Sequence, residues 1–290
     1  MDSKVSVIIP TYNRSKIIVQ AIKSVLNQIY QNFEIVVIDD SSDNETEKTI
    51  KSLNDERIKY IRNKIKTNLP TARNQGVKES SPDSKYIAFL DDDDEWLPQF
   101  LEKTVEKIEE NSEVAMIYTL MELRTKDNKK IGETKYNRKN KYWEQIIGTG
   151  CLIRKDIFTK ENFWYDERKV IDDLDFGLRV LKNHKWDCVP EVLMIYYPYP
   201  PSNETSASSA LPLKEIELFG EKHQGTYIAL GREALGFFHF KVGREFLKTG
   251  EIKKGEKEPV KSFFDISASQ TFFILFNEFI LSRIFSENSS

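Results

Sequence analysis

Short apolar runs alternate with segments of helical periodicity through the first 119 residues, and this alternation constrains the fold more than any other feature of the sequence. The apolar runs predict strands over residues 5–9, 33–38, 58–61, 86–90 and 114–119. The intervening segments predict helices over residues 17–28, 43–53, 69–79 and 98–111. Strands that alternate with helices form a parallel sheet with right-handed crossovers and helices on both faces. We therefore predict an α/β fold.

The alternation stops after residue 122. Residues 123–141 carry eight lysines or arginines against Asp127 and Glu133, and we expect a hairpin that is either a solvated loop or a surface contacting phosphate. A strand, a helix and a final strand are predicted over residues 151–154, 174–182 and 192–196. Prolines at 198, 200 and 201, followed by a serine-rich segment, mark a break in composition. We therefore predict a main domain at residues 1–210 and a C-terminal helical region at residues 211–290.

The composition is that of a soluble globular protein, with 39 % hydrophobic and 31 % charged residues in a chain of 290. The formal net charge of -3 provides no field that would recruit nucleic acid. Two cysteines cannot build a disulfide framework, and the N-terminus lacks the apolar segment of a signal peptide. No apolar run reaches the roughly 20 residues of a membrane span. We expect a cytoplasmic protein without a nucleic-acid partner.

The segment 270–285 is rich in aromatic and aliphatic side chains. It is too short to span a membrane and too apolar for a free surface helix. We expect it to pack on the body of the protein, to contact a second copy in a homo-oligomer, or to lie peripherally at the inner face of the membrane.

Four consecutive acids, Asp91, Asp92, Asp93 and Asp94, directly follow the apolar run 86–90. In open α/β sheets the ligand crevice lies outside the carboxyl ends of the strands, and a hard divalent cation held there by one or two carboxylates also binds substrate phosphates. The pattern favours a metal-bound phosphorylated ligand, and the alternative is a solvated acidic loop. A calcium-binding EF-hand is excluded because Trp96 occupies the position where that loop requires glycine.

Two earlier loops follow strands in the same way. Residues 10–14 contain no glycine, which excludes the close backbone approach of a nicotinamide or flavin site, whereas Tyr12 is suited to stacking on a base. Asp39 and Asp40 follow the second strand and are placed to accept a hydrogen bond from a base or a ribose. The alternative for this second loop is capping of the next helix by Ser41, Ser42 or Asp43.

Four ordered motifs resemble one known family. They are VSVIIPTYNR at 5–14, IDDSS at 38–42, ARNQG at 72–76 and FLDDDDEWLP at 89–98. Together they closely resemble family 2 glycosyltransferases over about residues 4 to 205. The resemblance implies the GT-A fold, with a Rossmann-like, mostly parallel sheet flanked by helices, in a catalytic domain at residues 1–210. It also implies inverting transfer of a sugar from a nucleotide diphosphate donor, usually with Mn2+ or Mg2+.

The resemblance also implies roles for individual residues. The metal would be bound by Asp93 or Asp94. The family's pattern of acids can be aligned with the four consecutive acids in two ways that differ by one residue. Asp92 is therefore a candidate, together with Asp91, for binding the ribose or completing the metal shell. The nucleotide would be held by Pro10, Thr11, Tyr12, Asn13, Asp39, Asp40, Arg73, Asp91 and Asp92.

A second pair of acids, Asp172 and Asp173, resembles the family's Glu-Asp motif at the head of a helix. Asp173 would deprotonate the acceptor hydroxyl as the catalytic base, and Asp172 would orient it. A base on the face opposite the leaving diphosphate suits a single displacement at the anomeric carbon. The alternative is a purely electrostatic role, because acids stabilise helix N-termini. Many relatives carry an arginine or a histidine in the loop after the last strand, and residues 196–201 contain neither.

We therefore predict a metal-dependent inverting glycosyltransferase that moves a sugar, most simply from a UDP-sugar, to a hydroxyl of a glycan, glycolipid or glycoprotein of the cell envelope. One alternative is a sugar nucleotidyltransferase, which would carry a glycine-rich basic loop after the first strand. Another is a non-catalytic module that binds a nucleotide-sugar without transferring it.

Overall fold

The computed structural model describes residues 3–125, 127–134, 148–167 and 172–197, with seven further residues between 218 and 226. The chain divides into two compact units, Met1–Ser206 and Ala207–Ser290. Nearly all described residues belong to the first unit. The seven described residues between 218 and 226 are helical, and the rest of the predicted C-terminal helical region, including the apolar segment 270–285, lies outside the described residues. Within the described part, no helix has both the length and the apolar character needed to cross a membrane.

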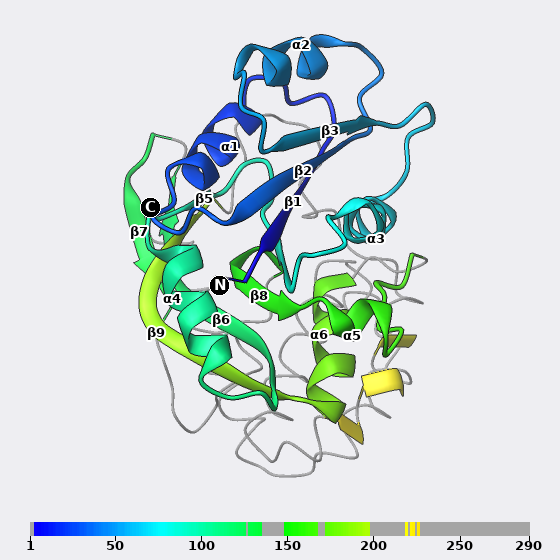
Figure 1. The fold of residues 1–290 in the computed structure, drawn as a ribbon, viewed down its shortest axis with the longest axis vertical. Coiled ribbons are helices and arrows are strands. Elements are labelled where there is room, and N and C mark those ends of the chain that lie inside the picture. Colours follow the sequence, from blue (N-terminus) through cyan, green and yellow to red (C-terminus); the bar gives the residue numbers. More distant parts are fainter. Residues whose placement is uncertain are drawn as a thin grey trace, which may run out of the picture. The chain divides into compact units, whose positions relative to one another are not determined.

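The first part of the sheet has the predicted alternation (Figure 1). Its strands are β1 (Val5–Thr11), β2 (Phe33–Asp39), β3 (Ile58–Arg62) and β4 (Tyr86–Phe89). Its helices are α1 (Ile18–Leu26), α2 (Glu45–Ser52) and α3 (Leu69–Glu79). β1 pairs in parallel with β2 and with β4, and β2 pairs in parallel with β3. The carboxyl ends of these four strands therefore point to the same edge of the sheet.

The second part of the sheet adds antiparallel strands. Its elements are β5 (Glu95–Trp96), α4 (Phe100–Glu109), β6 (Val114–Arg124), β7 (Lys130–Glu133), the 3-10 turn η1 (Gly148–Gly150), β8 (Cys151–Arg154), α5 (Asp156–Thr159), α6 (Asp172–Asn183) and β9 (Lys185–Tyr196). The strand order is β3-β2-β1-β4-β8-β6-β9-β5, with β7 on β6. β8 runs antiparallel to β4 and β6, whereas β6 and β9 are parallel. The predicted hairpin is present as β6 and β7, and residues 135–141 lie outside the described residues.

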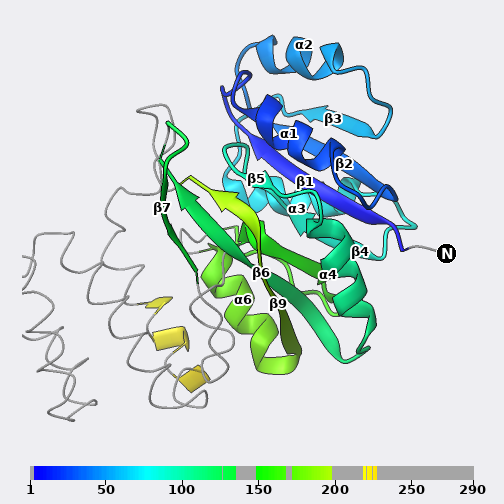
Figure 2. The ribbon, with the colours of Figure 1, turned by 90° about the vertical axis from the view of Figure 1, so that its left-hand side faces the viewer.

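Helices cover both faces of the sheet, because successive side chains of a strand belong to two different hydrophobic cores. Val7 and Ile9 of β1 belong to the core that includes α1 and α4, whereas Ile8 belongs to the core that includes α3, α5 and α6. Successive strand residues point to opposite faces, and every residue of β1 is buried, so β1 is covered on both sides. Figure 2 shows α4 and α6 on opposite sides of β6 and β9.

Helix α3 lies unusually close to β1. A Cβ atom on Gly76 would clash with Cγ2 of Ile8, so this position requires glycine. The helix begins where Asn68 Oδ1 accepts a hydrogen bond of 2.9 Å from the Thr71 backbone N–H. Arg73, one turn before Gly76 on the same helix, is buried, and its guanidinium carbon lies 5.9 Å from the centre of the Phe89 ring in β4.

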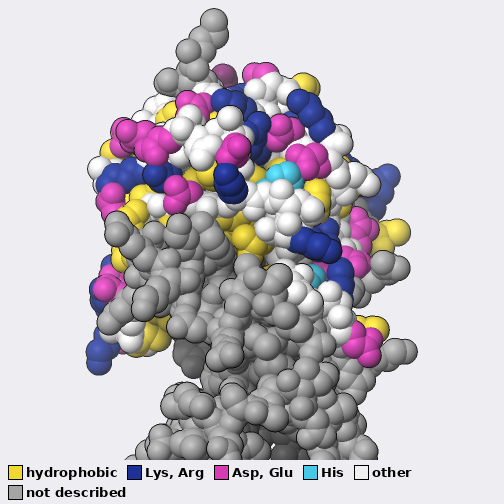
Figure 3. Space-filling model, turned by 90° about the horizontal axis from the view of Figure 1, so that it is seen from below, with side chains coloured by type: hydrophobic (Ala, Val, Ile, Leu, Met, Phe, Trp, Pro, Cys, Tyr) yellow, Lys and Arg dark blue, Asp and Glu magenta, His cyan; other side chains and the backbone are white. Residues whose placement is uncertain are grey.

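Charged side chains of both signs are interspersed on the described part of the face seen in Figure 3. This distribution is expected for a chain with 43 lysines and arginines and 46 aspartates and glutamates.

Candidate active site

Three loops meet at the carboxyl edge of β1, β2 and β4. Thr11 is the last residue of β1 and pairs with Asp39, the last residue of β2. The Thr11 hydroxyl donates a hydrogen bond of 2.6 Å to Oδ2 of Asp92, in the acid run that follows β4. The structure therefore brings the predicted nucleotide loops and the acid run together.

Asp92 is a buried member of the acid run. Its Oδ1 accepts a hydrogen bond of 2.8 Å from Nη1 of Arg14, and the same nitrogen lies 2.9 Å from Oδ2 of Asp93. The Asp92 side chain is only 6 % exposed. Burial raises the pKa of Asp92 to about 7 although Arg14 opposes this shift. Both oxygens of Asp92 are thus occupied by Thr11 and Arg14, and the proposed contact of Asp92 with the nucleotide remains a prediction.

Asp94 is also buried, on the other side of the turn. Its Oδ1 accepts a hydrogen bond of 3.1 Å from the Tyr197 backbone N–H, and its Oδ2 accepts one of 3.3 Å from the Thr149 hydroxyl. Burial raises the pKa of Asp94 well above its usual range, and repulsion by Asp91 and Asp93 adds to this shift. Asp94 therefore joins the acid run to η1 and to the end of β9.

Asp91 and Asp93 are the members of the run that remain accessible, with side chains 32 % and 16 % exposed. Burial raises the pKa of Asp93, and the Asp91 carboxylate raises it further, so a cation between them would relieve repulsion. The described residues contain no group of three or more potential metal ligands. Two carboxylates completed by substrate phosphates are nevertheless usual for Mg2+, so the residues present fit such an ion.

Arg73 connects the acid run to the start of α6. Its side chain is fully buried, and its Nη2 lies 3.0 Å from Oδ1 of Asp91. Its Nη1 donates a hydrogen bond to Oδ1 of Asp173. Asp173 is about a quarter exposed, whereas the side chain of Asp172, the first residue of α6, lies outside the described residues. The predicted base and the predicted donor-side acid therefore share one arginine.

Tyr196, at the end of β9, lies among the same carboxylates. Burial raises its pKa to about 12, and the charges of Asp94, Asp91, Asp93 and Asp173 act in the same direction. A phenol that stays protonated can donate a hydrogen bond within this acidic site.

The loops predicted to bind the nucleobase are connected by side-chain hydrogen bonds. Asp40 is buried, and its Oδ2 accepts hydrogen bonds from the Thr67 hydroxyl at 2.7 Å and the Thr67 backbone N–H at 3.0 Å. Its Oδ1 accepts one of 2.7 Å from Asn63. Asp39 is fully buried and accepts from Tyr60 at 2.6 Å and from the Ser41 backbone at 2.8 Å. Asp39 therefore stabilises the loop.

Tyr12 and the neighbouring positions form the rim of this loop cluster. Tyr12 is 38 % exposed, and Nζ of Lys66 lies 3.5 Å from the centre of its ring. Asn13 has a φ of 54°, in the left-handed region that asparagine tolerates. Asp43 accepts a hydrogen bond of 3.0 Å from the Glu45 backbone N–H, whereas Asn44, the N-cap residue of α2, makes no side-chain capping hydrogen bond.

Side chains without a predicted role complete the site. Arg14, Asn63, Thr67, Thr149 and Tyr197 all hydrogen-bond to predicted site residues without having been predicted themselves. A positive charge in the loop beside four acids is a signal that could have identified Arg14. Nothing in the local sequence distinguishes the other four.

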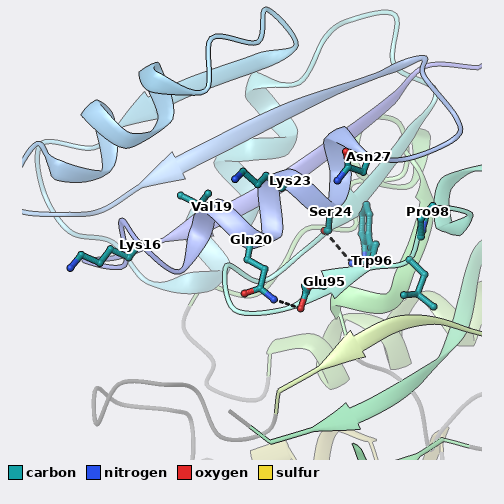
Figure 4. Close-up of a pocket in the computed structure, with 10 residues that line it drawn as sticks. Lys16, Val19, Gln20, Lys23, Ser24, Asn27, Glu95, Trp96 and Pro98 are labelled. Carbon is teal, nitrogen blue, oxygen red and sulfur yellow. Dashed lines mark hydrogen bonds between the residues drawn. The ribbon is translucent and has the colours of Figure 1, made fainter. Parts of the chain in front are cut away.

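A groove of about 520 Å³ lies between α1 and residues 95–98, beside the acid run. Figure 4 shows Gln20 bonded to Glu95 and the Ser24 hydroxyl bonded to the Trp96 backbone across it. Nε1 of Trp96 donates a hydrogen bond of 3.0 Å to the Thr149 carbonyl. These contacts hold the segment after the acid run between α1 and η1.

Residues 6–167, more than half of the chain, match the family described as glycosyl transferase family 2. The chain belongs to this family. It is 34 % identical over 153 residues to the Escherichia coli UDP-Glc:alpha-D-GlcNAc-diphosphoundecaprenol beta-1,3-glucosyltransferase WfgD, covering 52 % of this chain and 59 % of WfgD. It is 39 % identical over 110 residues to the Campylobacter jejuni GalNAc(5)-diNAcBac-PP-undecaprenol beta-1,3-glucosyltransferase, covering 37 % and 35 %. The match thus spans less than two thirds of either relative.

Solved structures resemble this family 2 chain over most of its length. TarS 1-349 of S. aureus in complex with UDP-GlcNAc has a TM-score of 0.67 at 18 % identity, covering 90 % of this chain and 78 % of that one. The mannosyltransferase PcManGT from Pyrobaculum calidifontis, in complex with GDP-Man and Mn2+, has a TM-score of 0.63 at 13 % identity, covering 93 % and 82 %. At these identities the likeness shows the fold, and the predicted GT-A class is confirmed.

Proposed function

We propose that this protein is an inverting glycosyltransferase that moves a sugar from a UDP-sugar to a hydroxyl of a lipid-linked glycan. The observation that carries the proposal is the buried Arg73, which binds both Asp91 of the acid run and Asp173 at the start of α6. Displacement at the anomeric carbon needs a donor site and a catalytic base in a fixed relative position. Arg73 provides this by binding both Asp91, on the donor side, and the candidate base Asp173.

The donor is assigned to the carboxyl edge of β1, β2 and β4. Tyr12 offers an exposed ring for the base, and Asp40 offers a carboxylate fixed by Asn63 and Thr67. Asp91 and Asp93 would hold Mn2+ or Mg2+, with Asp94 as the buried support of the turn. The metal, when bound, would neutralise charge on the leaving diphosphate.

In the proposed reaction, Asp173 accepts the proton of the acceptor hydroxyl. The acceptor oxygen forms a bond to the anomeric carbon while the bond from that carbon to the diphosphate oxygen breaks. The electron pair leaves with the nucleoside diphosphate, and attack from the opposite face inverts the anomeric configuration. Arg73 orients Asp173 through the hydrogen bond from its Nη1 to Oδ1.

The acceptor assignment rests on the similarity to relatives. WfgD and the Campylobacter enzyme are named for diphosphoundecaprenol-linked acceptors. A lipid-linked acceptor also fits the predicted cytoplasmic location with peripheral membrane contact. Cys151 and Cys188 are both buried and form no disulfide within the described part of the chain, which suits a reducing compartment.

A direct test incubates the full-length protein with Mn2+, a panel of UDP-sugars and GDP-sugars, and undecaprenyl diphosphate carrying a GlcNAc residue. We expect transfer from an α-linked UDP-sugar to give a β-linked product, identified by the anomeric coupling constant in NMR. An α-linked product would contradict inversion. Formation of UDP-sugar from UTP and a sugar phosphate would favour the nucleotidyltransferase, and donor binding without transfer to any acceptor would favour the non-catalytic module.

A further inference from the structure

Arg14 is fixed in place at both ends. Its backbone carbonyl accepts hydrogen bonds of 3.0 Å from Ile17 and 3.1 Å from Ile18, at the entry to α1. Its side chain reaches the acid run, where Nη1 binds both Asp92 and Asp93. Asp92 is held in turn by Thr11, so the guanidinium has little freedom to move.

Only one of the three nitrogens of this guanidinium is engaged. Nε and Nη2 make no hydrogen bond to another residue in the described part of the chain, and the Arg14 side chain is 17 % exposed. A guanidinium has five N–H donors in a planar fork, so three donors remain available. Such a fork matches two oxygens of a phosphate.

The other arginine at the acid run cannot offer such a fork. Arg73 is fully buried, and its Nη1 and Nη2 are both directed at carboxylates. Of the described residues, Arg14 and Arg73 are the cations that ion-pair with the acid run. Arg14 is therefore the described cation placed to meet an anionic ligand bound beside Asp93.

We propose that Arg14 binds the diphosphate of the donor through Nε and Nη2 and stabilises it as it leaves, an inference that rests on the proposed function. A phosphate held by a cation on Asp93 would lie next to the nitrogen that Arg14 already places 2.9 Å from that carboxylate. Asp92 then serves as the buried counter-ion that keeps Arg14 in position.

The test compares UDP with uridine, which has the same base and ribose but no phosphate. Each is titrated with Mn2+ into the wild type, Arg14→Gln and Arg14→Lys, by calorimetry for UDP and by NMR for uridine. Charge-assisted hydrogen bonds to phosphate are strong, so we expect Arg14→Gln to weaken UDP binding about tenfold to a hundredfold and to leave uridine binding unchanged. Arg14→Lys keeps the positive charge but lacks the planar pair of donors. We therefore expect its affinity for UDP to lie between those of the wild type and Arg14→Gln.

Lys16→Gln is the matched control, because it removes one positive charge from the same segment, and Lys16 forms no ion pair with the acid run. We expect it to bind UDP like the wild type. An equal loss of UDP and uridine binding in Arg14→Gln, with a lower thermal midpoint, would assign Arg14 a purely structural role and overturn the inference. Unchanged UDP binding would also overturn it. If the wild type itself does not bind UDP, the proposed function fails first.

Discussion

Nη1 of Arg73, on α3, donates a hydrogen bond to Oδ1 of Asp173, which lies 100 residues later in the chain near the start of α6. The same guanidinium binds Asp91 through Nη2 at 3.0 Å. The two acids thus have a shared counter-ion that is fully buried. A change in Arg73 should therefore affect both halves of the site together.

We expect Arg73→Gln to lower both kcat and stability, because it leaves Asp91 and Asp173 without their shared counter-charge. Breaking a fully buried ion pair costs about 3–5 kcal/mol, and we expect about 2–3 kcal/mol here because the acids are partly exposed. Denaturant unfolding measures the stability, and transfer assays measure kcat. Arg57→Gln, which removes a partly exposed guanidinium paired with Asp55, is the control. A variant with wild-type kcat would show that Arg73 does not position the base.

Asp93 and Asp94 should behave differently although they are adjacent. Asp93→Ala removes an accessible carboxylate, so we expect loss of Mn2+-dependent UDP binding with little change in stability. Asp94→Ala removes the acceptor of two buried hydrogen bonds, from Thr149 and Tyr197, and we expect a loss of about 1–3 kcal/mol. Calorimetry and thermal unfolding separate the two effects.

Glu56→Ala, at an exposed acid between α2 and β3, is the control for that pair of variants. Retained Mn2+ dependence of UDP binding in Asp93→Ala would rule out the metal assignment. Wild-type stability in Asp94→Ala would show that the buried hydrogen bonds contribute nothing.

Gly76→Ala should push α3 away from β1, because the added methyl group clashes with Ile8. Overpacking costs about 1–3 kcal/mol, which the better helix propensity of alanine offsets only in part. Gly132→Ala is the control, since a Cβ there has no atom within 4 Å. We expect the double variant Gly76→Ala, Ile8→Ala to be less destabilised than the sum of the single variants, as a double-mutant cycle can measure. Strict additivity would contradict a direct clash.

The fold was largely predictable where local signals were strong. Helix α3 was predicted over 69–79 from its helical periodicity, and these are its observed bounds, with Asn68 as the N-cap and Pro70 in the first turn. The strand predicted over 192–196 is only the second part of β9, which begins at Lys185. Pro190 lies inside β9 beside a register shift opposite Thr119 and Leu120, where a proline is tolerated. β5 has only two residues and exists through pairing with Ile195 and Met194. Such short pairing depends on tertiary contacts, and local patterns do not encode it.

The site was predictable only in its loops. The acids after the strands were expected near one edge because the carboxyl ends of parallel strands lie together, whereas Arg73 was placed near the nucleotide only by the resemblance to the family. The pairing of Arg14 with Asp92 spans 78 residues, and that of Thr149 with Asp94 spans 55. Which acid is buried and which is accessible depends on these partners, and for this reason the register of the acid run was left open by the sequence.

The most direct test of the account compares the wild type with Asp173→Asn, which keeps the shape of the side chain but removes the base. Donor binding with Mn2+ and the rate of transfer to a lipid-linked acceptor are measured on the same preparations. The account predicts unchanged affinity for the UDP-sugar and a transfer rate lower by about 10²- to 10⁴-fold. A variant that transfers sugar at the wild-type rate would contradict the assignment of Asp173 as the base.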